Sequence, residues 1–273
     1  MHFPHDSELG KPSAYPERYD RALLFPIARA PQREALGIGD ALPFHGVDVW
    51  NAYELSWLDA RGKPEVAIAE LRVPATTPHL VESKSLKLYL AGYHRERIAD
   101  RTSLRERLQQ DLSHATGGVV GVSLIEPARF AALGTDELAG ESIDALPVAI
   151  ESYGPPDASL LRAGGGDVDE TLVSNLLKSN CPVTGQPDWA GIAIAYAGPR
   201  IDREGLLRYL VSFREHADFH EHCVERIYVD LMRRCAPRRL SVYARYTRRG
   251  GLDINPWRSS DPGEPPNPRT ARQ

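Results

Sequence analysis

The chain has 273 residues, of which 26% are charged and 42% hydrophobic, an ordinary composition for a folded globular protein. Its formal net charge of -4 and sequence pI of about 6.2 exclude a strongly basic surface, so we expect no nucleic-acid partner. No apolar stretch approaches the roughly 18 residues of a membrane span, and the three cysteines are too few for a disulfide framework. The first residues also lack the basic and apolar pattern of a signal segment. We therefore expect a cytoplasmic protein without a membrane partner.

The first half of the chain begins with a segment of weak periodicity. Residues 1–45 are rich in proline and charge, so we expect an irregular arm on the surface. Residues 47–54 and 64–73 alternate in hydrophobicity, which predicts two antiparallel strands joined by a turn at 59–62. The alternation of charged and apolar residues at 81–89 is typical of a strand with a charged outer face.

A helix and a strand complete the first half, and the second half repeats the order. The helix begins near residue 100, with Thr102 or Ser103 as its N-cap, and residues 117–124 follow as a strand. The second half then predicts a strand, two helices and a strand over 190–196, 202–216, 219–234 and 239–247. Apolar residues at spacings of three and four give each of these helices a buried stripe, which predicts packing on a sheet. We expect an α+β protein built by duplication.

A linker between the two halves is indicated by composition. Residues 125–170 contain several prolines and three consecutive glycines at 164–166, which lack the lysine and hydroxyl of a phosphate loop and predict a flexible turn. We expect an N-terminal module with its arm at 1–150, a C-terminal module at 151–260, and a disordered tail at 261–273.

Cys181 is the candidate nucleophile. It lies between Asn180 and Pro182, and Gly185 can turn the chain so that Asp188 returns within reach of the sulfur. A carboxylate beside a thiol opposes its ionisation, so Asp188 makes more sense as a proton donor. The simpler interpretation makes Cys181 a small buried hydrophobe and Asp188 a turn residue.

Polar residues crowd the start of the last long helix. Phe219 is an aromatic that can form a wall there, and free backbone N–H groups lie at a helix start. His216 and His220 are four apart, as are Asp218 and His222, so a zinc site must be considered. It is not favoured, because no third ligand stands at a suitable spacing.

A second group of candidates lies in the first half. Glu82 opens the alternation at 81–89, where its carboxylate could accept two N–H donors from a purine-like ring edge. Lys84, Lys87 and Arg249 together could hold a phosphorylated cofactor. No G-x-G-x-x-G segment follows a predicted strand, so a Rossmann dinucleotide site is unsupported.

Four segments taken together resemble the NADPH-dependent 7-cyano-7-deazaguanine reductase family, QueF, in its long two-module form. They lie at 82–89, 179–189, 219–221 and 248–256. The resemblance implies tandem tunnelling-fold modules, with antiparallel sheets each packed with a pair of helices, that assemble into a homodimer. It also implies reduction of the nitrile of 7-cyano-7-deazaguanine to 7-aminomethyl-7-deazaguanine with NADPH, in tRNA queuosine biosynthesis.

The resemblance assigns a role to each matching residue. Cys181 would attack the nitrile carbon to form a covalent thioimide, and Asp188 would protonate the nitrogen. The implied substrate contacts are Val81, Glu82, Ser83, Phe219, His220 and Glu221. The implied NADPH contacts are Ser83, Lys84, Arg249 and Gly250. No metal is implied.

Two other functions stay open at this point. A hydrolase similar to GTP cyclohydrolase I would share the fold but use zinc and water in place of a thioimide. A noncatalytic purine or pterin binding module would keep Glu82 and Glu221, yet it would have no need for Cys181 beside Asp188.

Overall fold

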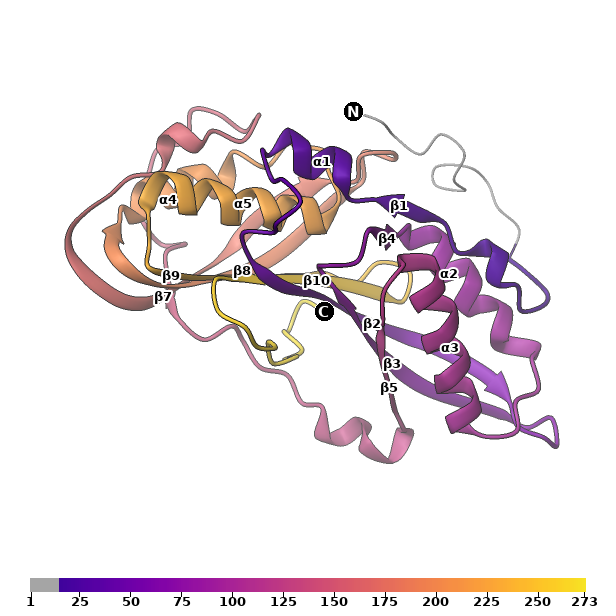
Figure 1. Ribbon diagram of the computed structural model, residues 1–273. Helices are drawn as coiled ribbons and strands as arrows, with labels where there is room; N and C mark the ends of the chain where they lie inside the picture. The colour runs from indigo at the N-terminus through magenta and orange to yellow at the C-terminus, as the bar shows by residue number, and fades with distance from the viewer. Residues whose placement is uncertain (1–14) are drawn as a thin grey trace. The chain divides into compact units, whose positions relative to one another are not determined.

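The computed structural model describes residues 15–273, and their contacts divide the chain into two compact units (Figure 1). Of the described residues, unit 1 comprises 15–32, Asp48–Gly134 and Arg248–Ile254, and unit 2 comprises Arg33–Val47, Thr135–Thr247 and Asn255–Gln273. The main boundary lies between Gly134 and Thr135 and not near residue 150, and each unit also includes a short segment from the other half of the sequence.

Unit 1 is built on the predicted hairpin. Strands β2 (His45–Leu58) and β3 (Pro64–Pro74) are neighbours in a sheet of order β5, β3, β2, β10, and Gly62 N–H closes the turn on Asp59 O at 2.9 Å. Strand β5 (Gly121–Ile125) pairs antiparallel with β3, and β10 (Leu252–Ser259) contributes its first three residues to this unit. The hairpin and the strand after the helix are thus confirmed.

The segment at 81–89 is a helix, so the predicted strand is wrong. Helix α2 (Ser83–Ala91) begins after Glu82, whose carboxylate accepts the N–H groups of Lys84 and Ser85 at 2.7 and 2.8 Å. A side chain that caps two free N–H groups favours a helix start. The helix then buries side chains at the spacings of three and four that one face provides, which are Leu86, Tyr89 and Leu90.

The next helix of unit 1, α3 (Arg101–Thr116), has a different cap from the predicted one. Asp100, and not Thr102 or Ser103, is the N-cap, and its carboxylate accepts Ser103 N–H at 2.8 Å. The helix ends at Gly117, whose φ of 77° lies in the left-handed region that favours glycine. Helices α2 and α3 cover the hydrophobic core of this unit, which includes Trp57.

Unit 2 has a longer hairpin on the same plan. Strands β7 (Ala163–Asn180) and β8 (Pro187–Ile201) pair antiparallel, β9 (Arg239–Tyr246) pairs with β8, and the end of β10 pairs with β9. The glycines at 164–166 lie inside β7, so the predicted flexible turn is wrong. The β7–β8 register shifts between Ala163 and Asp167, and glycine suits such an irregular stretch of strand.

The helix pairs of the two units have the same lengths. Helix α4 (Arg203–Val211) has 9 residues like α2, and α5 (His220–Cys235) has 16 residues like α3. In Figure 1, α4 and α5 lie over the strands of their own unit. The order strand, strand, helix, helix, strand therefore occurs twice, and the fold is α+β with two tandem tunnelling-fold modules, each an antiparallel sheet packed with a helix pair.

The remaining elements are short. A separate two-stranded sheet pairs β1 (Pro26–Ala28) with β4 (His79–Val81), and β6 (Glu141–Ser142) pairs parallel with β7. Short 3-10 turns lie at Arg21–Leu23, Gly92–Arg95, Pro127–Ala132 and Ala158–Leu160. Within residues 15–273, no helix combines the length and apolar character needed to cross a membrane.

Two expectations about the chain ends differ from the structure. The expected arm includes helix α1 (Ala30–Ala35), where the Arg33 guanidinium donates two hydrogen bonds to the buried Glu225, at 2.7 and 3.0 Å; residues 1–14 lie outside the described residues. The expected disordered tail packs against unit 2, because the Gln273 amide donates to Tyr246 O at 2.9 Å and to Asn255 Oδ1 at 2.8 Å. Buried polar partners hold both segments.

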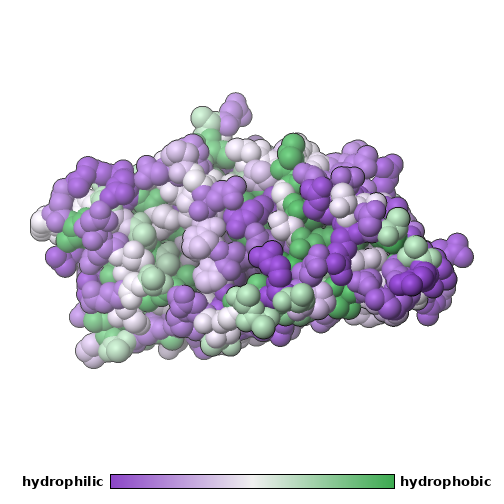
Figure 2. Space-filling model, turned by 90° about the horizontal axis from the view of Figure 1, so that it is seen from below, coloured by the Kyte–Doolittle hydropathy of each residue, from purple (hydrophilic) through white to green (hydrophobic). Residues whose placement is uncertain are grey.

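Hydrophobic and hydrophilic residues intermix on the face of the molecule in Figure 2. The exposed large hydrophobic side chains of the described residues include Val66, Val119 and Leu176, which are far apart in the sequence. This mixture identifies no single docking surface on that face, so the expected homodimer stays a prediction.

Candidate active site

Cys181 begins the tight turn that joins β7 to β8. Its N–H donates to Gln186 O at 2.8 Å, and its carbonyl oxygen accepts Gly185 N–H at 3.0 Å. Gly185 has a φ of 68°, which a side chain would disfavour. Cys181 is only 6% exposed. The candidate nucleophile is thus held by a short hairpin turn and screened from solvent.

Asn180 ties this turn to the segment before α5. Its N–H donates to His216 O at 2.8 Å, its carbonyl oxygen accepts Asp218 N–H at 3.1 Å, and its side-chain oxygen accepts Lys178 Nζ at 2.6 Å. Because Asn180 and Cys181 are adjacent in the chain, these bonds place the approach to α5 beside Cys181.

Asp188 lies across the hairpin from the residues that precede Cys181. It is paired with Ser179 in the β7–β8 register and is 4% exposed. Cross-strand partners point to the same face of a sheet, and so do residues two apart along a strand. Asp188 therefore shares a face with Ser179, and Cys181 follows Ser179 by two residues, just after the end of β7. The Asp188 Oδ2 atom is 3.3 Å from His220 Nε2. The structure therefore brings together two of the predicted site residues.

Tyr246 supports this pair and was missed by the sequence analysis. Its ring stacks on the His220 imidazole, with centroids 3.8 Å apart and planes within 5°. Burial holds the pKa of Tyr246 well above its ordinary value, and the neighbouring Cys223 and Asp188 add to the effect. Its hydroxyl therefore stays protonated. No local sequence signal identifies Tyr246, because its place follows from the β8–β9 register, which pairs it with Ala190, two residues after Asp188.

Glu221 and Phe219 stand at the start of α5, as predicted. Glu221 lies in the first helical turn and is 2% exposed. A carboxylate at this end of a helix is stabilised by the helix dipole. Phe219 is the N-cap residue, but its side chain makes no capping hydrogen bond. Its ring centroid lies 5.8 Å from that of His222.

The polar residues considered for zinc are divided between two carboxylates. Asp218 accepts Phe219 N–H at 2.8 Å and His222 Nδ1 at 3.1 Å, and its second oxygen is 3.6 Å from His216 Nε2, whereas His220 faces Asp188. Burial alone would raise the pKa of Asp218, but the two neighbouring histidines and the Phe219 N–H outweigh it and hold that pKa well below its usual range. Among residues 15–273, no group of three or more such side chains is arranged to hold a metal ion.

In unit 1, Glu82 combines burial with its capping role. The side chain is fully buried, and Val81 before it is 4% exposed. Burial raises the pKa of Glu82, although the N–H groups of Lys84 and Ser85 oppose that rise. Each carboxylate oxygen accepts one backbone N–H, and a carboxylate has about four acceptor sites. The carboxylate therefore keeps acceptor capacity beyond these two hydrogen bonds.

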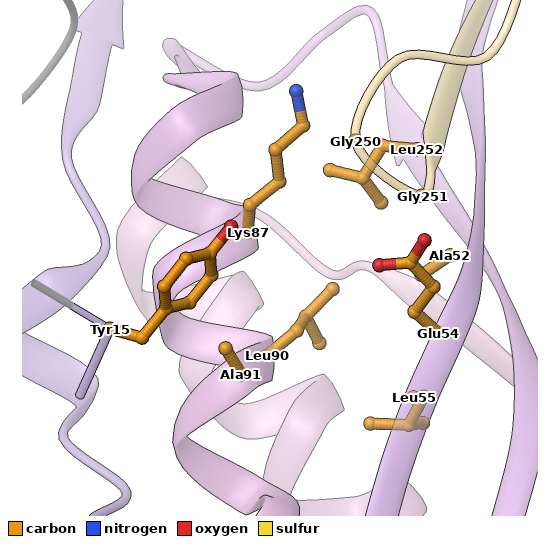
Figure 3. A pocket seen from close by; sticks show the side chains of 10 residues that line it. All are labelled: Tyr15, Ala52, Glu54, Leu55, Lys87, Leu90, Ala91, Gly250, Gly251 and Leu252. Atoms are coloured by element: carbon orange, nitrogen blue, oxygen red, sulfur yellow. The ribbon is translucent and has the colours of Figure 1, made fainter. Parts of the chain in front are cut away.

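Of the four residues implied to contact NADPH, Gly250 lines a small cavity of unit 1, whereas Ser83, Lys84 and Arg249 are not among its lining residues (Figure 3). It measures about 120 Å³ and lies between Lys87 of α2, Glu54 of β2 and the turn at Gly250. Gly250 has a φ of 56°, and a Cβ there would stand 3.3 Å from the end of the Lys87 side chain. Ser83 and Lys84 lie at the start of the same helix. The glycine places no side chain between the turn and the Lys87 cation, and a cation favours an anionic group beside it.

The predicted site residues divide between the two units. Cys181, Asp188 and Phe219–Glu221 belong to unit 2, whereas Val81–Lys84 and Arg249–Gly250 belong to unit 1. The sequence analysis also missed Glu54 of the unit 1 cavity, because its carboxylate reaches Gly251 only through the fold: a Cβ on that glycine would lie 2.5 Å from Glu54 Cδ.

Two family profiles match the chain. Residues 15–124 match the family described as nitrile reductase, 7-cyano-7-deazaguanine-reductase N-term, and residues 187–264 match that described as QueF-like protein. The solved apo structure of an archaeosine synthase described as QueF-like aligns with 37% of this chain and 99% of its own, at 16% identity and a TM-score of 0.31, which is too low to bear on the fold.

Curated relatives match along nearly the whole chain, and each is named NADPH-dependent 7-cyano-7-deazaguanine reductase. The Bordetella pertussis protein is 58% identical over 269 residues, which is 98% of both chains. The Chromobacterium violaceum protein is 56% identical over 272 residues, covering 99% of this chain and 98% of its own. The Burkholderia cenocepacia protein is 56% identical over 275 residues and 99% of both chains.

Proposed function

Because the chain belongs to the QueF family of NADPH-dependent 7-cyano-7-deazaguanine reductases, we propose that it reduces the nitrile of this base through a thioimide on Cys181. As a member of this family it is an NADPH-dependent oxidoreductase. The observation that carries the thioimide is the hairpin register, which sets Asp188 opposite Ser179, two residues before Cys181, and within 3.3 Å of His220.

The first step adds the thiol across the nitrile. The Cys181 sulfur bonds to the nitrile carbon, one carbon–nitrogen π bond breaks, and the thiol proton moves to the nitrogen by way of Asp188. His220 faces Asp188 and can hold that proton while the carboxylate is ionised. The product of this step is a thioimide, which accepts hydride more readily than a nitrile does.

Reduction to the amine needs two hydrides, and bound NADPH supplies this chemistry. Between the two hydride steps the sulfur leaves as thiol and an imine forms, which water would hydrolyse. Cys181, Asp188 and Glu221 are each buried to 94% or more, with exposures of 6%, 4% and 2%. Such burial supports a site that keeps water from the imine.

Binding of the base and the cofactor is assigned to the remaining residues. Glu221 and Glu82 would accept N–H groups of the deazaguanine ring, with Val81, Ser83, Phe219 and His220 as further contacts. Ser83, Lys84, Arg249 and Gly250 would hold NADPH. We place the enzyme in queuosine biosynthesis in the cytoplasm, as a homodimer. Family membership favours this function over the hydrolase and the noncatalytic binding module.

The test is intact-mass measurement after mixing the protein with 7-cyano-7-deazaguanine in the absence of NADPH. The wild type should gain the mass of the whole nitrile, because addition releases no leaving group. Cys181→Ala should gain nothing, and Cys235→Ala, which alters a different buried cysteine, should gain the full mass. An adduct that survives in Cys181→Ala would refute the assignment of the nucleophile.

A further inference from the structure

The orientation of the His220 imidazole is weakly determined by its polar contacts. Nε2 is 3.3 Å from Asp188 Oδ2, which is long for a hydrogen bond. Among the described residues, the buried Nδ1 atom has no hydrogen-bond partner. An imidazole fixed at one nitrogen by a long contact can still turn about its side-chain bonds. Another feature must therefore set its plane.

Tyr246 provides that feature. Its ring lies parallel to the imidazole within 5° at 3.8 Å, so the stack defines the plane in which Nε2 points to Asp188. The β8–β9 register pairs Tyr246 with Ala190, and Asp188 precedes Ala190 by two residues on the same face. The stack and the carboxylate thus come from one surface of the sheet.

Tyr246 is itself held firmly in place. It is fully buried at the end of β9. Its N–H donates to Asn255 Oδ1 at 3.1 Å, and its carbonyl oxygen accepts the Gln273 amide at 2.9 Å. Gln273 also donates to Asn255 Oδ1, at 2.8 Å. A ring with a backbone anchored on both sides is a rigid support for a movable imidazole.

We propose that Tyr246 is a positioning residue for the reaction, whose ring holds His220 in the plane that pairs Nε2 with Asp188 and so keeps the proton path to the substrate nitrogen aligned. This rests on the proposed function. No bond to the substrate forms at Tyr246. The ring face carries the effect, and the hydroxyl is dispensable.

Three substitutions separate the ring from the hydroxyl. Tyr246→Phe keeps the ring and should retain kcat within about threefold of wild type. Tyr246→Leu removes the stack and should lower kcat by about tenfold or more, with KM for the nitrile changed by less than about threefold, because general acid–base catalysis is worth about a hundredfold or more. Tyr246→Met fills the volume without a ring and replaces the leucine variant if that one does not fold. A phenylalanine variant as slow as His220→Ala overturns the proposal.

A double-mutant comparison tests whether Tyr246 acts through His220. If it does, adding Tyr246→Leu to His220→Ala should slow the enzyme no further, and the pH dependence of kcat should change in the same way in both single variants. Losses that multiply would show an independent, structural effect and overturn the proposal. Thioimide formation separates this outcome from failure of the proposed function: every Tyr246 variant should still gain the nitrile mass, only more slowly.

Discussion

Helices α3 and α5 have the same length in the two units, yet they begin in different ways. Helix α3 starts at Asp100, whose carboxylate caps the helix in the usual manner. Helix α5 starts at Phe219 without a side-chain cap, and the next two residues are His220 and the buried Glu221. In the duplicated fold, one helix start is therefore stabilised by a side-chain cap, whereas the other lacks such a cap and carries residues that we assign to catalysis and substrate binding.

The shorter helices α2 and α4 differ less. Both begin after a carboxylate, Glu82 in unit 1 and Asp202 in unit 2, and each carboxylate accepts backbone N–H groups. Glu82 is fully buried and accepts two of them, whereas Asp202 accepts one, at 3.2 Å. A cap that has become buried can serve the fold and the proposed site together.

The largest effect in unit 2 should follow from removing the acid. Asp188→Asn should lower kcat by about a hundredfold or more, while the dissociation constant of the nitrile changes little, because the role of Asp188 lies in proton transfer. Steady-state kinetics and equilibrium binding measure the two quantities. Asp261→Asn, at an exposed position of the same unit, should leave both unchanged. A wild-type rate in Asp188→Asn would remove this residue from the mechanism.

Comparing Glu221 with Glu82 tests whether one carboxylate contributes to binding alone and the other to both binding and stability. Glu221→Leu should weaken nitrile binding by about 1.5–3 kcal/mol, the value of a hydrogen bond to a charged group. Glu82→Leu should weaken binding and also lower the free energy of unfolding by about 1 kcal/mol, because it removes a cap. Calorimetry and denaturant unfolding measure both. Wild-type affinity in Glu221→Leu would refute its contact with the ring edge.

The two units should also respond to pH with opposite signs. Burial raises the pKa of Glu82 above its ordinary 4.5, so its stabilising contribution is complete below that value and is lost as pH rises through the raised pKa. Asp218 has a lowered pKa, so its contribution is present above 3.8 and is lost as pH falls further. The stability difference from Glu82→Gln should therefore shrink at higher pH, and that from Asp218→Asn at acid pH. Unfolding curves that show equal trends would contradict this assignment.

The smallest expected effect is on stability and follows from removing the side-chain cap of α3. Asp100→Ala should lower the free energy of unfolding by about 1 kcal/mol through loss of the α3 cap, with kcat unchanged. Thermal unfolding and steady-state kinetics give the two values. A large loss of activity would mean that the start of α3 is more than structural.

Strong periodicity made much of the fold predictable. The hairpin near residue 59 and the helices of unit 2 follow from alternation and from apolar spacings of three and four. The segment at 81–89 misled because charged and apolar residues alternate in it, while the decisive interaction is the Glu82 side chain folding back on two N–H groups. That contact has no periodic signature.

The site was predictable only where its residues are close in sequence. Cys181 and Asp188 lie on the two sides of one short turn, and the β7–β8 hairpin brings the end of β7 beside the start of β8. Tyr246 lies in another strand, and its place beside His220 depends on the β8–β9 register and on the packing of α5. Such distant pairings arise from tertiary structure, which local spacing does not encode.

The buried carboxylate of Glu225 has a consequence for dividing the protein. It accepts hydrogen bonds from Arg258 and from Arg33, and Arg33 belongs to the short segment Arg33–Val47, which is separated in sequence from the main segment of unit 2 that begins at Thr135. A fragment expressed from Thr135 onward would bury that carboxylate with part of its counter-charge missing. Cloning the second repeat alone should therefore give a less stable product than the duplicated sequence suggests.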